Sequence, residues 1–579
     1  MGKILKKLNV LLDRKQKLTM AVLLVMMLIG AMLEVASIGI VVPVVSIVMD
    51  ENAIHNGGIV QFLFELLPVE NARQFTIVIM LSLIGMFILK NIFLYIQQKF
   101  MLSFVYGNQF STSERMMKNY LRKDYEFYLN ADTAVVQRNI TSDVNNMYAL
   151  ILALLQLLSE GIVFVCLVAV LFLQDPVMTV LVTVVLLAVL FVIKLVLKPI
   201  MHKAGEDNQN FYSGLYKLIS QTVMGIKEVK IAGKEQYFVD EYIQCGKGYV
   251  NAVQRFSLFN NIPRLLIETV MIICMVGYML YLLLKGTGVE TMIPTISAFG
   301  VAAMRLLPSA TRINNQLNTI AFSEPFFMGV SDNLQDEING QNIDMSFAKE
   351  SKEKLPVKKS IELKDITYAY PNTDKLIFDH ADLTVPVGSS VGIVGTSGAG
   401  KSTVVDILLG LLKVQTGHIY ADGVDVMEHY RAWLKNIGYI PQMIFMLDGT
   451  IRENVAFGVH KEAISEERIW EVLREAQLDE FVRGLPEGLD TQIGERGIRL
   501  SGGQRQRIGI ARALYEDPEV LILDEATSAL DNDTEAAIMD SINRLHGRKT
   551  LVIIAHRLQT IEKCDMIYRV EDGKCVRED

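Results

Sequence analysis

The stretch Gly395-Thr-Ser-Gly-Ala-Gly-Lys-Ser402 fits the pattern G-x-x-x-x-G-K-[ST] of a phosphate-binding loop. It follows Ser390–Val394 (SVGIV), which is typical of a buried strand, and it precedes Thr403–Leu412, which is apolar and helical in pattern. Glycines allow backbone N–H groups to point at phosphate oxygens, and the N-terminus of the following helix adds a favourable potential. We therefore expect Lys401 to neutralise the β- and γ-phosphates of ATP and Ser402 to offer its hydroxyl to Mg²⁺.

A second run typical of a buried strand, Val520–Leu523, ends in two acidic residues, Asp524 and Glu525. Side chains at the carboxyl end of a strand in an open α/β sheet face the ligand crevice. We therefore expect Asp524 to hold Mg²⁺ through water and Glu525 to polarise the attacking water. The alternative is that the two acids only cap the next helix, and the phosphate-binding loop upstream disfavours it.

Another anion-binding helix start lies at Leu500-Ser-Gly-Gly-Gln504, ahead of an arginine-rich helical stretch. It follows the loop at Lys401 by roughly a hundred residues. A single nucleotide does not easily need both helix starts from one subunit. We therefore expect a head-to-tail dimer in which each ATP lies between the Lys401 loop of one chain and the Ser501 loop of a second copy.

The part of the chain before these motifs has the composition of a membrane protein. Hydrophobic residues make up 51% of the 579 residues, and apolar runs crowd residues 18–322. A membrane-spanning helix needs about 20 mainly apolar residues. The sequence predicts six such helices, at about 18–49, 75–105, 147–174, 177–197, 262–284 and 291–322. The first is too long for the core of a signal peptide, so we expect it to be retained.

The distribution of lysine and arginine predicts the orientation of these helices. Basic residues crowd the segment before the first predicted helix, whereas the loop at 50–74 and the next two outer turns hold very few. We therefore expect the N-terminus and the ATP-binding half to lie in the cytosol, with the chain in the cytoplasmic membrane. The long inner connections, 106–146 and 198–261, keep helical stretches and are expected to reach the ATP-binding half.

The sequence thus predicts a membrane domain at 1–335, a polar linker at 336–358 and an ATP-binding domain at 359–579. The predicted fold class is an α-helical domain with six spans joined to an α/β P-loop nucleotide-binding domain. In the first outer loop, Ile59–Leu67 predicts a short interfacial helix, with a packed loop as the alternative. The net charge of −8 argues against a nucleic-acid partner, and the five cysteines show no metal-ligand spacing, so we expect free thiols.

Charged residues inside predicted spans are costly, and their default interpretation is functional. Four basic residues are candidates for a substrate-binding lining in the inner half of the membrane domain: Lys90, Arg264, Arg305 and Arg312. Arginine suits phosphate because its planar fork bonds two oxygens at once. The alternative is internal pairing, with Glu268 opposite Arg305, and with Glu34 and Glu160 answering Lys90. Charge alone leaves both interpretations open.

The motifs after residue 370 resemble those of the ATP-binding cassette exporters, half-transporters that carry one membrane domain and one ATP-binding domain. Tyr370 matches the family's adenine-stacking aromatic residue, and Gln442 matches the glutamine that links the γ-phosphate and metal site to the membrane domain. His556 matches the γ-phosphate histidine, and Ser528–Asp531 matches a dimer-contact loop. The resemblance implies nucleotide contacts for Tyr370, Gly395, Ser397, Gly398, Gly400, Lys401, Ser402, Thr403, Ser501, Gly502, Gly503, Gln504 and Asp531. It implies catalytic roles for Glu525, His556 and Gln442 and metal contacts for Ser402, Gln442 and Asp524.

Stretches of the membrane half are similar to bacterial lipid-linked oligosaccharide flippases of the cassette family. They are Leu33–Pro43 (LEVASIGIVVP), Ile262–Arg264 (IPR), Met304–Arg312 (MRLLPSATR) and Lys198–Gly205. The resemblance implies an anionic glycolipid substrate whose pyrophosphate meets the basic residues. Lys90 stands where the family pattern has arginine, so it keeps the charge and loses the fork. A general lipid or multidrug exporter is the alternative, and a peptide exporter and a soluble cassette ATPase are disfavoured. The identity of the glycan, the direction of transport and homodimer versus heterodimer stay open.

The composite-site hypothesis predicts how two damaged subunits behave together. In a mixed dimer of one Lys401→Ala subunit and one Ser501→Arg subunit, both lesions should fall in one ATP site and leave the other intact. Purified mixed dimers should therefore hydrolyse more ATP than homodimers of the double mutant. Equal rates for the two preparations would rule out a site shared between subunits.

Overall fold

The computed structural model describes residues 2–49, 64, 72–174, 176–284, 289–339, 353–525, 532–555 and 561–578, with the backbone alone at several of them, including 38–49 and 289–305. Most of the predicted outer-loop helix Ile59–Leu67 lies outside the described residues. The chain forms two compact units. Unit 1 comprises Met1–Leu121 and Ala131–Asn342, and unit 2 comprises Arg122–Asn130 and Ile343–Asp579.

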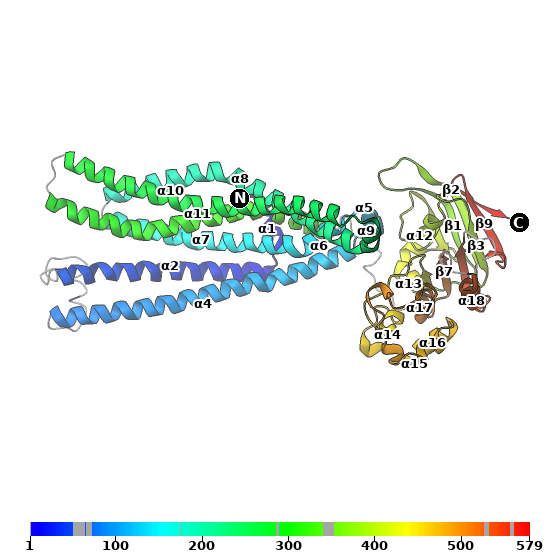
Figure 1. Cartoon of the computed structure of the whole chain (residues 1–579). Helices are drawn as coiled ribbons and strands as arrows, with labels where there is room; N and C mark the ends of the chain where they lie inside the picture. The colour runs from blue at the N-terminus through cyan, green and yellow to red at the C-terminus, as the bar shows by residue number, and fades with distance from the viewer. Residues whose placement is uncertain are drawn as a thin grey trace. The chain divides into compact units, whose positions relative to one another are not determined.

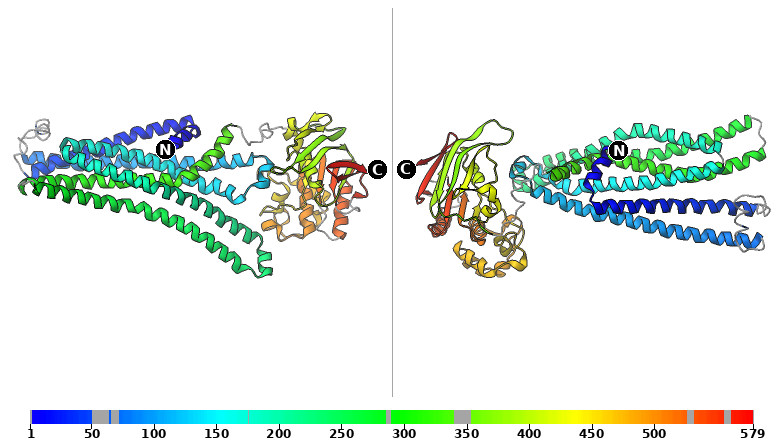
Figure 2. Two further views of the ribbon diagram at one scale, coloured as in Figure 1. Left: turned by 90° about the horizontal axis from the view of Figure 1, so that it is seen from above. Right: turned by 180° about the vertical axis from the view of Figure 1, so that it is seen from behind.

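Unit 1 is a bundle of long helices (Figures 1 and 2). Its elements are α1 (Gly2–Leu11), α2 (Arg14–Met49), α4 (Ala72–Leu121), α6 (Thr133–Arg138), a π-helical turn (Asn139–Asp143), α7 (Val144–Gln174), α8 (Pro176–Met224), α9 (Ile226–Ala232), α10 (Glu235–Leu284) and α11 (Val289–Asn339). Among the described residues, five helices are long and apolar enough to cross a membrane, namely those of α2, α4, α7, α8 and α10. Helix α11 covers the sixth predicted span, 291–322, but the side chains of its first part lie outside the description.

The helices of unit 1 extend well beyond the predicted spans. The spans at 75–105 and 177–197 lie within helices that reach Leu121 and Met224, and the span at 262–284 lies within a helix that begins at Glu235. Polarity marks where a helix leaves the lipid, whereas a helix ends only where its backbone pattern is broken. The helices therefore continue past the predicted spans, as expected of inner connections that are polar but keep helix-compatible residues.

Glycine at position 205 allows α8 to pack closely against α11. A Cβ atom at Gly205 would collide with the backbone carbonyl oxygen of Phe322, and a backbone atom cannot move aside as a flexible side chain can. Next to this contact, Ala204 is fully buried and the ring of Phe322 lies 4.3 Å from that of Phe256, centroid to centroid. The close approach therefore requires a residue without a side chain at this point of α8.

Unit 2 contains two sheets and a set of short helices (Figure 1). The four-stranded sheet has the order β2-β1-β4-β5, and the six-stranded sheet has the order β10-β9-β3-β8-β7-β6. The strands are β1 (Ser360–Ala369), β2 (Leu376–Pro386), β3 (Ser390–Val394), β4 (Thr416–Ala421), β5 (Val424–Asp425), β6 (Ile437–Ile440), β7 (Val520–Asp524), β8 (Thr550–Ile554), β9 (Met566–Glu571) and β10 (Lys574–Glu578). The helices are α5 (Tyr125–Asn130), α12 (Lys401–Leu408), α13 (Tyr430–Leu434), α14 (Ile451–Val455), α15 (Glu466–Glu475), α16 (Asp479–Arg483), α17 (Gly502–Tyr515) and α18 (Asn532–Asn543).

The centre of the six-stranded sheet is parallel and buried. Strand β3 pairs in parallel with β8 and β9, and β7 pairs in parallel with β6 and β8. Every residue of β3, β7 and β8 is buried. Because parallel strands end at the same edge, the loop after Val394 and the acids at the end of β7 lie at one edge of this sheet.

Two boundaries differ from those expected of the sequence. Helix α11 continues to Asn339, into the segment predicted as a linker from residue 336. Residues Arg122–Asn130 fold with unit 2, although they stand between two helices of unit 1 in the sequence. The sequence does not show that Arg122–Asn130 belongs to unit 2, because the residues that this segment contacts are more than 200 positions further along the chain.

The close packing at Gly205 predicts a clear effect of a single methyl group. Gly205→Ala should destabilise unit 1 by about 1–3 kcal/mol, the usual cost of overpacking, despite the better helix propensity of alanine. The measurement is the thermal unfolding temperature of the purified protein in detergent. Gly246→Ala on α10 is the matched control, since a Cβ there meets only Leu215 at 3.9 Å. Equal unfolding temperatures for the two variants would contradict this account of the α8–α11 contact.

Candidate functional site

The phosphate-binding loop connects the buried strand β3 to helix α12. Gly400, the residue before α12, has a φ of 108°, a left-handed conformation that favours glycine, and a Cβ there would lie 2.9 Å from Ile377. The ammonium group of Lys401 donates to the backbone carbonyls of Gly395 and Thr396, each at 3.1 Å. The lysine side chain therefore folds back over the loop, where a bound phosphate would meet it.

The two acids at the end of β7 are held by side chains from neighbouring elements. The hydroxyl of Ser402 lies 3.3 Å from Oδ1 of Asp524, and the hydroxyl of Tyr439 on β6 lies 3.4 Å from Oδ2 of the same carboxylate. The side-chain amide of Gln442 donates to Oε2 of Glu525 at 2.7 Å. The structure thus brings together four residues that the sequence analysis singled out, Ser402, Gln442, Asp524 and Glu525. Tyr439 was missed, and its place three residues before Gln442 on a predicted strand was the available signal.

The backbone at Glu525 is strained. Its φ is 48°, which is uncommon for a residue with a Cβ, and its N–H donates to the carbonyl of Ile554 on the neighbouring strand at 3.2 Å. Non-glycine residues in this conformation persist only when the surrounding structure fixes them, and they cluster at functional sites. The turn aims the Glu525 carboxylate toward Gln442 and not along the strand direction of β7.

Burial dominates the electrostatics of this edge of the sheet. It raises the pKa of the Asp524 carboxyl, and the charge of Glu525 adds to this effect, whereas the hydroxyls of Ser402 and Tyr439 and the charge of Lys401 oppose it. Burial likewise raises the pKa of Asp406 on α12 to about 6, with a further contribution from Asp524. The carboxyl groups of Asp406, Asp524 and Glu525 therefore lie close enough to interact electrostatically, and a cation bound beside them would favour their charged forms.

The adenine-side candidate Tyr370 follows directly after β1. Its hydroxyl lies 3.0 Å from that of Thr403, and its ring contacts Tyr368 edge to face at a centroid distance of 5.3 Å. Two sequence-predicted nucleotide contacts, Tyr370 and Thr403, therefore lie beside each other.

The second anion-binding helix start has the local structure that its sequence predicts. Ser501 caps α17: its hydroxyl accepts from the N–H of Gln504 at 3.2 Å, and the Gln504 side chain accepts from the N–H of Ser501 at 2.8 Å. This reciprocal capping box orders the first turn, which carries Gly502 and Gly503. The predicted contacts of His556 and Asp531 lie outside the described residues.

The segment Arg122–Asn130 contacts the rest of unit 2 beyond the end of α12. Lys413, which lies beyond the end of α12, donates from its side chain to Asp124 at 2.8 Å and from its backbone N–H to Glu126 at 3.3 Å. The hydroxyl of the buried Tyr368 also donates to Glu126 at 3.3 Å. The inner connection 106–146 was expected to reach the ATP-binding half, and this part of it does so.

The basic candidates of the membrane half are more neutralised than expected. Arg312 pairs with Glu160 at 2.9 Å, and Arg264 pairs with Glu268 one turn away at 3.2 Å. Lys90 is buried, with its ammonium group 4.6 Å from the centroid of the Phe87 ring. Glu268, the suggested partner of Arg305, pairs with Arg264; the side chain of Arg305 lies outside the described residues, so the suggested pair stays a prediction.

Comparison with known proteins agrees with this architecture. Residues 378–528 match the family ABC transporter, and residues 44–287 match the family ABC transporter transmembrane region. A solved structure of a bacterial Atm1-family ABC exporter with ATP bound superposes with a TM-score of 0.76 at 20% identity, covering 97% of this chain and 95% of that chain.

Curated relatives match over part of their length. The ATP-dependent lipid A-core flippase of Pectobacterium atrosepticum is 33% identical over 62% of this chain and 60% of its own length. The heterocyst differentiation ATP-binding protein HepA of Nostoc sp. is 32% identical over 62% of this chain and 57% of its own length. The lipid A-core flippase of Escherichia coli is 38% identical over 48% of this chain and 46% of its own length. This chain thus spans about half the length of the curated relatives it matches. Together with the helical bundle, the parallel sheet and the phosphate-binding loop, these findings give the chain the fold of an ABC exporter, in which a region similar to the ABC transporter transmembrane region and a region similar to the ATP-binding ABC transporter family lie in one polypeptide.

Proposed function

We propose that this chain is one half of a homodimeric exporter in the cytoplasmic membrane that hydrolyses ATP to move a lipid-linked substrate outward. The N-terminus and the ATP-binding domain face the cytosol in this proposal. One observation supports ATP hydrolysis most directly: both acids at the end of β7 accept side-chain hydrogen bonds. Asp524 accepts from Ser402, and Glu525 accepts from Gln442.

The oxygen donors at this edge fit a magnesium ion. The hydroxyl of Ser402 and the carboxylate of Asp524 come from different elements and lie 3.3 Å apart, and oxygen ligands of this kind are those that Mg²⁺ prefers. When bound, the ion would neutralise charge on the β- and γ-phosphates. Ser402, Asp524 and Gln442 would hold it, and Lys401 would supply a second positive charge from the loop.

Glu525 is the residue placed to orient the attacking water. Its carboxylate is anchored through one oxygen, Oε2, by the amide of Gln442, and the strained backbone fixes its direction. A carboxylate held in this way can accept a hydrogen bond from water and take its proton as the bond to phosphorus forms. Because Gln442 contacts this carboxylate directly, a displacement of Gln442 would change the rate of hydrolysis.

For the substrate we favour a polyprenyl-pyrophosphate-linked oligosaccharide or a related anionic glycolipid. The two arginine–glutamate pairs run through the Nε atom of each arginine, and the side chains of Arg264 and Arg312 are 66% and 53% exposed. Their terminal N–H groups are therefore accessible for phosphate oxygens. Two of the relatives are named ATP-dependent lipid A-core flippases, and a lipid cargo in those proteins supports a lipid-linked substrate here by analogy.

A general lipid exporter is the second candidate, and two observations favour it. The two described candidate arginines, Arg264 and Arg312, each have a carboxylate partner, and Lys90 is buried against an aromatic ring. Both features lower the positive charge that a pyrophosphate would meet. The two candidates differ in whether the arginines bind the headgroup or only neutralise their partners.

Replacing Glu525 tests the ATPase part of the proposal. Glu525→Gln keeps the size of the side chain and removes the base, so the rate of ATP hydrolysis should fall by about 10²–10⁴-fold while Mg-ATP still binds. The measurements are phosphate release and the binding of labelled ATP. Glu519→Gln, an exposed acid just before the same strand, is the control that should hydrolyse ATP normally. A normal rate for Glu525→Gln would remove this residue from the mechanism.

Replacing Arg312 tests the substrate part. Arg312→Gln should lower flipping of a polyprenyl-pyrophosphate oligosaccharide in proteoliposomes by at least about tenfold, because charge-assisted hydrogen bonds of about 1.5–3 kcal/mol are lost. The double variant Arg312→Gln/Glu160→Gln should not recover, since removing the partner carboxylate does not restore the guanidinium. Recovery in the double variant would show that Arg312 only neutralises Glu160, and it would favour the general lipid exporter.

A further inference from the structure

A pocket in unit 1 shares no residue with the ATP site or with the basic candidates of the membrane half. It is lined by α1, α4, α7, α11 and the chain around the start of α2, and its empty space, counted up to the open mouth, is about 450 Å³. Leu8 and Leu11 of α1 and Leu334 of α11 form part of an apolar wall. An ion pair between Lys7 and Asp332 attaches α1 to α11 next to this wall. The first helix of the chain therefore closes one side of the pocket.

The other side of the pocket is polar and is centred on Tyr148. This residue is only 3% exposed, and its hydroxyl lies 2.7 Å from that of Thr112 on α4. Arg115, one turn further along α4, and Asp13 also line the pocket, and the charges of both act on the Tyr148 hydroxyl. The pocket thus joins an apolar wall to a guanidinium, two hydroxyls and a carboxylate, a combination that suits an amphipathic ligand.

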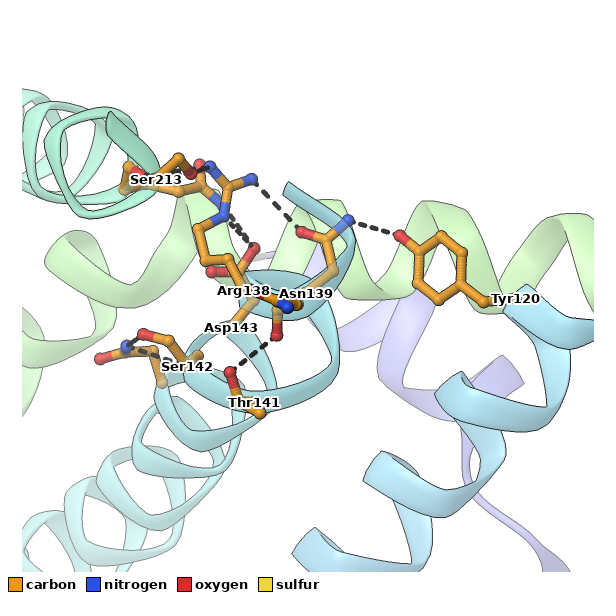
Figure 3. A network of polar contacts seen from close by, with 10 residues as sticks. Tyr120, Arg138, Asn139, Thr141, Ser142, Asp143 and Ser213 are labelled. Carbon is orange, nitrogen blue, oxygen red and sulfur yellow. Dashed lines mark hydrogen bonds and ion pairs between the residues drawn. The ribbon is translucent and has the colours of Figure 1, made fainter. Parts of the chain in front are cut away.

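Hydrogen bonds between α4 and the start of α7 fix the polar side of the pocket. The hydroxyl of Ser113 on α4 donates at 2.7 Å to the backbone carbonyl of Ile140, in the π-helical turn that leads into α7. The side-chain amide of Asn139 in the same turn donates to the hydroxyl of Tyr120 on α4 at 2.6 Å (Figure 3). Because these bonds set the spacing of the two helices, a ligand meets a preformed site, and binding requires little ordering of the protein.

The pocket lies at the level of one boundary of the predicted membrane spans. Tyr148 is the second residue of the span predicted at 147–174, and Gln16, which also lines the pocket, precedes the span predicted from residue 18. Beyond Gln16, α2 exposes the apolar side chains of Leu18 and Val22. A ligand whose polar head occupies the pocket can therefore place acyl chains along the lipid-facing side of α2.

The charge around the pocket favours an anionic ligand. Of residues 2–17, six are basic and one, Asp13, is acidic. Clusters of basic residues next to a membrane span attract anionic lipid headgroups. Arginine in particular binds two phosphate oxygens at once through its planar fork. Five of the six basic residues are exposed, namely Lys3, Lys6, Arg14, Lys15 and Lys17.

Asp13 narrows the choice of headgroup. A carboxylate beside the guanidinium disfavours a phosphate with two negative charges, because like charges repel each other. The same carboxylate can accept hydrogen bonds from hydroxyl groups. A phosphodiester that carries one negative charge and a headgroup with free hydroxyls fits both Arg115 and Asp13.

We propose that this pocket binds the headgroup of phosphatidylglycerol, a membrane phospholipid with one negative charge. Arg115 binds the phosphate, the hydroxyl of Ser111 in the same lining adds a donor, and Asp13 accepts from the glycerol hydroxyls. The lipid belongs to the inner leaflet under the orientation proposed above. This site is separate from the transported substrate, so it goes beyond the proposed function and does not depend on what the exporter carries.

The test measures lipid binding to the full-length protein in detergent by native mass spectrometry, as the apparent Kd of the first bound lipid. The unchanged protein should bind phosphatidylglycerol at least about tenfold more tightly than phosphatidylethanolamine with the same acyl chains. Arg115→Gln should weaken the binding of phosphatidylglycerol by about tenfold or more, because charge-assisted hydrogen bonds to the phosphate are lost. Ser111→Trp keeps the arginine but puts a large side chain at an exposed edge of the pocket, and it should weaken binding to a similar degree.

The matched control is Lys118→Gln, which removes an exposed positive charge of α4 that does not line the pocket. It should bind phosphatidylglycerol like the unchanged protein. The proposal is overturned if Arg115→Gln binds this lipid as tightly as the control does, or if Ser111→Trp has no effect. Unfolding temperatures without added lipid show which variants are folded, and Ser111→Trp decides the question if Arg115→Gln is not.

Two further arms identify the ligand. Equal affinities for phosphatidylglycerol and phosphatidylethanolamine would overturn the assignment to an anionic lipid. Glycerol 3-phosphate, a soluble phosphate without acyl chains, should bind far more weakly than the lipid, and equal binding would mean that the pocket holds a soluble phosphate. None of these measurements involves ATP hydrolysis or flipping, so failure here is distinguishable from failure of the proposed function.

Discussion

The ATP-binding domain depends on holding two carboxylates side by side at one end of a buried strand. Asp524 and Glu525 would repel each other and lose their charge in an apolar interior if no other group were present. Hydrogen bonds stabilise the two carboxylates: the hydroxyls of Ser402 and Tyr439 donate to Asp524, and the amide of Gln442 donates to Glu525. Each comes from a different place in the sequence, and the parallel sheet brings them to one edge. The order of strands β3, β8, β7 and β6 is therefore what makes the site possible.

Within unit 2, the segment Arg122–Asn130 contacts a residue that follows α12. Lys413 receives Asp124 and Glu126 just beyond the end of α12, the helix that starts with Lys401 and Ser402. A change at the phosphates thus has a short path, through α12, to the segment Arg122–Asn130.

The membrane domain follows a different constraint, because charge in lipid must be neutralised or used. Arg264 and Arg312 satisfy it with glutamate partners, and Lys90 satisfies it by burial against Phe87. Such pairs permit a charged lining at modest cost, since each arginine keeps donors beyond those used for pairing. Under the proposed function, a headgroup competes with the partner carboxylates for Arg264 and Arg312.

The sequence by itself determined the local features of this protein. Three of these features depend on interactions over only a few residues, so neighbouring residues in the sequence are enough to predict them. They are the glycine pattern before Lys401, the apolar run before Asp524 and the Ser501–Gln504 capping box. Long apolar stretches likewise determined the membrane helices, because lipid imposes a length and a composition. Tertiary structure alone decided the contacts between distant residues: Tyr439 beside Asp524, Glu126 beside Lys413, Arg312 beside Glu160, and Asp132 beside Lys217. These pairings depend on helix direction and strand order. The identity of a polar residue therefore does not predict which distant residue it contacts in the folded protein.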